Sequence, residues 1–224
     1  MSVLVVTGVA REARIAAAPG VQTICSGGSP SRLHELLAHH DPAETAVILS
    51  FGIAGGLNPA LIPGHVIVAD AVVSHVHRWP TDAELTDALM GALQSCSDLS
   101  VVRASIAGVD HALLDSIAKN ASRVHTGAAV VDMESHIAAE YAAAHGLRFA
   151  AIRVVCDPAN RSLPPLVNEA LEPDGSISFR GVFRSLTRQP GQIGDLIRLA
   201  RDSQVAFRAL ERAGAVWRQA FLGA

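Results

Sequence analysis

Residues 128–157, AAVVDMESHIAAEYAAAHGLRFAAIRVVCD, contain two apolar segments of strand length with a helical pattern between them. We predict a short buried strand over 128–132, a helix over 135–145 and a core strand over 149–156. A strand, a helix and a second strand in succession are typical of an α/β domain built in layers.

The same alternation continues through the rest of the chain, with Gly and Pro turns between the segments. Apolar runs predict strands at 3–7, 21–25, 45–51, 66–77 and 101–106, the fourth of them long, bent and leaving the sheet. Helical patterns predict helices at 12–18, 31–39, 82–95, 111–119, 166–171, 179–186 and 192–221. No repeat or linker divides the chain, so we expect one domain over residues 1–224.

Composition excludes several classes of protein. The net charge of −3 lacks the basic excess of a nucleic-acid-binding protein. No apolar run reaches the roughly 18 to 20 residues that span a bilayer, and the N-terminus has no signal-peptide pattern, which predicts a cytoplasmic location. Three widely spaced cysteines suggest no disulfide framework, and His75 with His77 lacks a third ligand, so we expect no metal site.

A basic stripe is predicted near the C-terminus. Arg180, Arg184 and Arg188 recur every four residues beside Val182, Phe183 and Leu186. On a helix this pattern suits contact with an anionic membrane surface, and the alternative is a solvated helix face.

Carboxylates follow several of the predicted strands. Glu12 comes four residues after Gly8, Asp132 and Glu134 follow the strand at 128–132, and Asp157 follows the strand at 149–156. In open α/β sheets ligands bind outside the carboxyl ends of strands, so Glu134 and Asp157 could face one cleft. The structural alternatives are helix capping at 132–134 and turn formation at Asp157.

Residues 50–56, SFGIAGG, form a glycine-rich segment that we predict to be a loop from Gly52 onward. Glycines allow close backbone approach, either to a ligand or to a neighbouring strand. The segment lacks the GxGxxG spacing and leads to a proline and a strand, so we expect no dinucleotide cofactor.

Three segments together resemble the family of nucleoside phosphorylases and methylthioadenosine/adenosylhomocysteine nucleosidases. They are TGVAREA (7–13), SFGIAGGLNPALIPGHVIVAD (50–70) and VVDMESHIAAEYAAAHGLRFAAIRVVCDPAN (130–160), in family order. The resemblance implies a single three-layer α/β domain with a central mixed twisted sheet flanked by helices. DMESH (132–136), VVCDPANRSLPP (154–165) and FRSLTRQPGQIGDLIRLARD (183–202) most resemble the hopanoid-associated branch, which implies release of adenine from adenosylhopane.

The resemblance also implies roles for the residues at the strand ends. Glu134 would bind the ribose hydroxyls with Met133 packed beside it, and Asp157 would hydrogen-bond the purine and protonate it, with Asp132 also near the base. Glu12 would orient the attacking water. The backbone near the nucleophile would come from Gly8, Gly52, Ile53, Ala54 and Gly55. Burial would have to raise the pKa of Asp157, and strand alternation puts Arg153 on the same side, where it would oppose this.

The choice between water and phosphate as nucleophile depends on departures from the family pattern. Ser50 stands where the phosphorylase arginine would fall, and Ile53 where the phosphate-binding serine would fall. A carboxylate at Glu12 would repel phosphate. These features favour hydrolysis, with phosphorolysis as the alternative and no metal or organic cofactor in either.

Three functions remain open from the sequence. The chain is an enzyme acting on a lipid-linked adenosine, an enzyme acting on a small thio-adenosine, or a non-catalytic nucleoside-binding relative. The presence of both Glu134 and Asp157 argues against the third. The family resemblance also implies a homo-oligomer.

Overall fold

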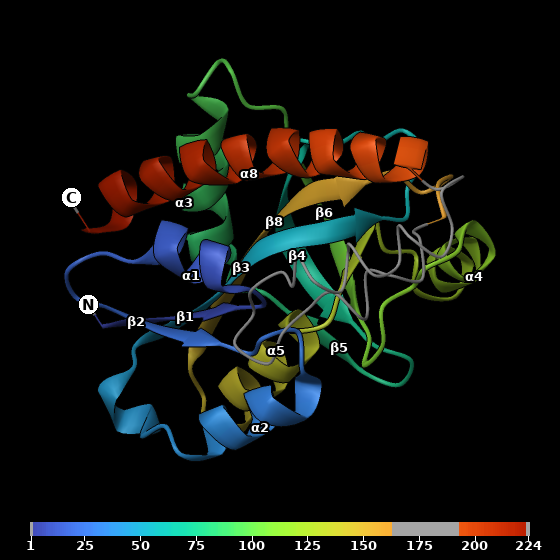
Figure 1. Ribbon diagram of the computed structural model, residues 1–224. Coiled ribbons are helices and arrows are strands. Elements are labelled where there is room, and N and C mark those ends of the chain that lie inside the picture. Colours follow the sequence, from blue (N-terminus) through green and yellow to red (C-terminus); the bar gives the residue numbers. More distant parts are fainter. Residues whose placement is uncertain (1, 163–192, 223–224) are drawn as a thin grey trace.

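The computed structural model describes residues 2–162 and 193–222. It confirms a three-layer α/β fold with a central mixed sheet flanked by helices (Figure 1). The predicted helices at 166–171 and 179–186 and the arginine stripe at 180–188 lie outside the described residues. The single domain over 1–224 and the homo-oligomer stay predictions.

Eight strands form the sheet. They are β1 (Val3–Thr7), β2 (Val21–Cys25), β3 (Val47–Gly56), β4 (Val66–Val73), β5 (Arg78–Pro80), β6 (Val101–Gly108), β7 (Val130–Asp132) and β8 (Arg148–Asp157). β1 pairs with β2 and β3 in parallel, and β3 pairs with β8 in parallel but with β7 antiparallel. The pairings β3–β8, β8–β4, β4–β6, β6–β7 and β7–β3 close a ring, so β3 and β8 lie at the centre of the fold.

Helices cover both faces of this sheet. They are α1 (Ala10–Ala16), α2 (Pro30–Ala38), α3 (Ala83–Gln94), α4 (Ser116–Thr126), α5 (Ser135–Ala144) and α8 (Ile193–Leu222), with a 3₁₀ turn at Pro42–Glu44. α1, α3 and the long α8 lie on one face, and α2 and α5 lie on the other (Figure 1). α8 agrees with the predicted helix at 192–221.

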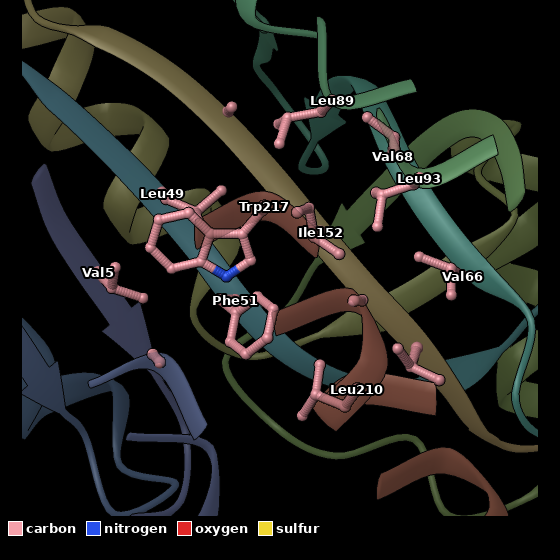
Figure 2. Packing of buried hydrophobic residues seen from close by; sticks show 14 of the residues in the cluster. Val5, Leu49, Phe51, Val66, Val68, Leu89, Leu93, Ile152, Leu210 and Trp217 are labelled. Atoms are coloured by element: carbon pink, nitrogen blue, oxygen red, sulfur yellow. The ribbon is translucent and has the colours of Figure 1, made fainter. Parts of the chain in front are cut away.

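The larger core lies between the sheet and α8. Trp217 of α8 is 1% exposed and packs against Phe51 of β3, with ring centroids 6.3 Å apart (Figure 2). Leu49, Ile152 and Leu210 surround the same position. Aromatic side chains bury large apolar areas, so this contact anchors α8 on the central strands.

Three predicted elements are wrong in their extent. The segment at 66–77 does not leave the sheet: β4 pairs with β6 and β8, then turns at 74–77 into β5. The glycine-rich segment is not a loop, because β3 continues through Gly56. The helix expected at 111–119 is α4, which starts later because the Asp115 side chain accepts a hydrogen bond from the Ala118 amide as its N-cap.

Candidate active site

Three of the four carboxylates predicted from the strand ends, Glu12, Asp132 and Glu134, meet around one buried cation, Arg153 of β8. Its guanidinium is fully buried, lies 2.5 Å (Nε) from Asp132 and 3.6 Å (Nη2) from Glu134, and acts electrostatically on Glu12. Three carboxylates from three elements therefore surround one positive charge.

Arg153 uses most of its hydrogen-bond donors within the protein. Nη2 donates to the Ser50 hydroxyl at 2.7 Å, Nε and Nη2 lie 3.3 Å from the Ser135 hydroxyl, and Nη1 donates to the Ile53 carbonyl at 3.4 Å. Ser50 stands where the sequence comparison expected an arginine, and Arg153 of β8 places its positive charge next to Ser50 instead. Most of the N–H donors of Arg153 therefore already have an acceptor within the protein.

Glu12 is held by backbone amides. One oxygen accepts from Gly8 at 2.7 Å and Val9 at 2.9 Å, and the other accepts from Ile53 at 2.8 Å. Burial raises the pKa of Glu12, while Arg153 and the three amides act in the opposite direction. The carboxyl group therefore joins the residues just after β1 to Ile53 within β3.

Glu134 lies at the start of α5 and is 7% exposed. The Ser26 hydroxyl donates to its Oε1 at 3.3 Å. The pKa of Glu134 is raised to about 7, mainly by burial: Asp132 and Glu12 also raise it, whereas Arg153 and the Ser26 hydrogen bond lower it. The group therefore changes charge near neutral pH.

This pKa shift predicts a pH dependence of stability. Because the pKa of Glu134 lies above its ordinary value of 4.5, the folded protein binds more protons than the unfolded chain between about pH 4.5 and pH 7. The stabilisation that protonated Glu134 provides is fully present below about pH 4.5, and the free energy of unfolding falls as pH rises from about 4.5 to about 7. Glu134→Gln should make the fall shallower in denaturant titrations at several pH values; a slope equal to that of wild type would contradict the assignment.

Asp132 and Met133 lie where β7 ends and α5 is about to begin. Asp132 Oδ1 accepts from the Ser135 amide at 2.9 Å and the Glu134 amide at 3.3 Å, and its Oδ2 is bound by the Ser135 hydroxyl and Arg153. These contacts fix the start of α5 and orient Arg153. Met133 is partly exposed. Contact of Asp132 or Met133 with a nucleoside stays a prediction.

Asp157, the fourth of these carboxylates, is not an ion-pair partner of Arg153. It forms a buried ion pair with Lys119 of α4, which the sequence analysis did not identify. The pairing of β3 with β8 skips Cys156, since Ala54 faces Val155 and Gly55 faces Asp157. This bulge breaks the alternation that had placed Arg153 and Asp157 on the same side. Burial raises the pKa of Asp157, and Lys119 opposes the shift.

Glycines just after β1 and within β3 make room for these carboxylates. A Cβ atom at Gly8 would lie 2.8 Å from Glu134 Oε1, and one at Gly52 would lie 2.5 Å from both Glu12 Oε1 and Arg153 Nη1. At Gly55 it would lie 3.5 and 3.6 Å from the carboxylate oxygens of Asp157. Ala54, between them, is buried in the core on the α2 and α5 side, and Ile53 is partly buried.

Gly52→Ala should therefore lower the free energy of unfolding by about 1–3 kcal/mol, the usual effect of overpacking. Gly91 of α3 is the matched control, because a Cβ there meets nothing within 4 Å. Gly91→Ala should be neutral or stabilising, by about 1 kcal/mol at most, since alanine is the better helix former. Denaturant unfolding measures both; a Gly52→Ala protein as stable as wild type would show that the cluster has more room than the structure gives it.

Within residues 2–162 and 193–222, no group of three or more His, Cys, Asp or Glu side chains could hold a metal ion. In the same part of the chain, no helix is long and apolar enough to cross a membrane.

Comparisons with known proteins agree with this fold. The family model of the phosphorylase superfamily matches residues 3–174. A comparison with curated protein sequences finds no match.

Three solved structures illustrate the structural likeness. A 5′-methylthioadenosine/S-adenosylhomocysteine nucleosidase from Campylobacter jejuni has 16% identity and a TM-score of 0.64, over 82% of this chain and 97% of its own. The Neisseria meningitidis enzyme in complex with methylthio-immucillin-A has 19% identity and a TM-score of 0.65, over 81% and 96%. An S-adenosylhomocysteine nucleosidase from Streptococcus pyogenes has 17% identity and a TM-score of 0.63, over 71% and 85%.

The family model spans most of the chain, and its matched region contains Glu12, Glu134, Arg153 and Asp157. The chain therefore belongs to the phosphorylase superfamily.

Proposed function

We propose that the chain hydrolyses the N-glycosidic bond of an adenine nucleoside. The observation that carries the proposal is a set of three buried carboxyl groups with raised pKa values in a chain of this superfamily. Glu12 and Glu134 come after β1 and β7, and Asp157 is the last residue of β8. Perturbed carboxyl groups gathered at strand ends are typical of acid–base sites.

Cleavage of the bond passes through an oxocarbenium-like state, so the enzyme must stabilise positive charge on the sugar and protonate the departing base. Asp157 donates a proton to a purine ring nitrogen as the electron pair of the C–N bond moves onto the base. Glu134 accepts hydrogen bonds from the ribose hydroxyls, with Met133 beside the sugar and Asp132 near the base. Glu12 orients a water molecule and accepts one of its protons as the water oxygen forms the new bond to the anomeric carbon.

Charge in the cluster supports water over phosphate as the nucleophile. Glu12, Asp132 and Glu134 surround the single guanidinium of Arg153. A phosphate dianion would enter a region with three carboxyl groups and one guanidinium, most of whose donors already have acceptors in the protein, so little would offset its desolvation. Arg11, the cation nearest in sequence to Glu12, instead pairs with Glu211 and lies over the Phe207 ring of α8.

The small thio-adenosines are the favoured substrates. The three solved structures above carry the names of nucleosidases for methylthioadenosine or adenosylhomocysteine. Adenosylhopane is the second candidate, supported by the segments at 132–136, 154–165 and 183–202, the last of which lies mostly outside the described residues.

A substrate panel tests the proposal. Purified protein is incubated with methylthioadenosine, adenosylhomocysteine, adenosylhopane and inosine, and the free base is measured. We expect adenine from the small thio-adenosines with kcat/KM at least tenfold above that for adenosylhopane, and little reaction of inosine. A preference for adenosylhopane would favour the second candidate, and no release from any substrate would refute both.

A further inference from the structure

Lys119 of α4 is the only lysine in the chain, and the other 17 basic residues are arginines. Its side chain is 1% exposed, although lysine is among the residues least often buried. A buried ion pair rarely stabilises a fold more than apolar residues of the same volume, so stability alone does not account for this contact.

The ammonium group of Lys119 meets three acceptors around the end of β8. It binds Asp157 Oδ2, the Pro158 carbonyl at 3.1 Å and the Arg161 carbonyl at 3.0 Å. An ammonium has three N–H donors, so each has an acceptor. The contacts tie Asp157 and the loop that follows it to the first turn of α4.

The two oxygens of Asp157 are in different situations. Oδ2 is occupied by Lys119, whereas Oδ1 has no hydrogen-bond partner among the described residues. Lys119 thus fixes one side of the carboxyl group, while the other side has no such partner among the described residues. Gly55 of β3 lies against the same carboxyl group and has no side chain to cover it.

We propose that Lys119 is the positioning residue for Asp157: it binds Oδ2, directs Oδ1 toward the purine and sets the pH range in which Asp157 carries its proton. This inference rests on the proposed function, in which Asp157 protonates the leaving base. Lysine suits the position better than arginine, since a compact ammonium matches three converging acceptors and a planar guanidinium does not.

The effect of Lys119 on Asp157 has a definite sign. The charged groups that face Asp157 are Lys119 of α4, Arg161 in the following loop and Asp202 of α8. Burial raises the pKa of Asp157, Lys119 and Arg161 lower it, and Asp202 raises it; the neighbouring Cys156 thiol has a pKa of about 12 and stays neutral. Because Asp157 must hold a proton to donate it, activity falls as pH rises through its pKa. Without the Lys119 charge, this fall moves to higher pH.

The test is the pH profile of kcat/KM for Lys119→Met, Lys119→Arg and Arg123→Met, the last an exposed position one turn further along α4. Lys119→Met should lower kcat/KM at least tenfold and move the descending limb up by about one pH unit. Lys119→Arg should keep the limb at its wild-type position, and Arg123→Met should match wild type throughout. Loss at all pH values with an unmoved limb, or no loss, would overturn the proposal.

A second measurement separates this inference from the proposed function. Protein labelled with ¹³C at lysine Cε gives a single side-chain signal, because Lys119 is the only lysine. In a pH titration this signal should report the ionisation of Asp157, and the inflection should be missing in folded Asp157→Asn. If no substrate releases adenine, the proposed function fails while this titration still tests the pairing. Identical titration curves for the two proteins would overturn the inference.

Discussion

Asp157→Asn should reduce kcat/KM for adenine release by a factor of about 10² to 10⁴, the usual contribution of a general acid. The fold should persist, because the amide oxygen of asparagine can still accept a hydrogen bond from Lys119, and the change in volume is small. The amide has no acidic proton to give to the leaving base. Steady-state kinetics on methylthioadenosine measures the loss.

Asp87→Asn is the control for this variant. Asp87 lies on α3 and pairs with Arg103 at the exposed surface, so its loss removes a carboxylate without touching the site. It should retain wild-type kinetics. Near-normal turnover by a folded Asp157→Asn protein would remove Asp157 from the mechanism.

Arg153→Met should lower the free energy of unfolding by about 3–5 kcal/mol, the range for removing one partner of a buried ion pair. The guanidinium is fully buried between Asp132, Glu134 and Glu12, and its removal leaves these carboxyl groups buried without a cation. Typical domains are stable by about 5–15 kcal/mol, so the variant should unfold at much lower denaturant concentration.

Arg103→Met provides the comparison, since Arg103 forms an ion pair with Asp87 in which both side chains are largely exposed. Exposed pairs contribute little to stability, so its unfolding midpoint should stay close to wild type. Equal midpoints for the two arginine variants would show that the Arg153 cluster does not hold the strand ends together.

The apolar pattern predicted the layered fold well, because strands covered by helices on both faces consist of nearly continuous apolar residues. β1, β2 and α8 were predicted to within a residue at each end. The glycine segment was misjudged because glycine favours loops locally, whereas here Gly52 makes room for Glu12 and Arg153, and Gly55 for Asp157, beside a continuous strand.

The partners of the site residues were less predictable. Strand alternation along β8 predicted that Arg153 and Asp157 lie on the same side of the strand. The bulge at Cys156 makes this wrong, and because the bulge depends on how β3 pairs with β8, no local sequence pattern predicts it. The pairing of Lys119 with Asp157 joins residues 38 positions apart. Its one signal in the sequence was that the chain contains a single lysine.

The central claim, hydrolysis of a glycosidic bond, is tested most directly by the sugar product. Methylthioadenosine is incubated with the protein in ¹⁸O-labelled water, with and without phosphate, and both products are identified by mass spectrometry. We expect adenine at the same rate in both conditions and free methylthioribose carrying one ¹⁸O atom, since water is the nucleophile. Adenine release that requires phosphate and yields a sugar 1-phosphate, or no release at all, would contradict the account.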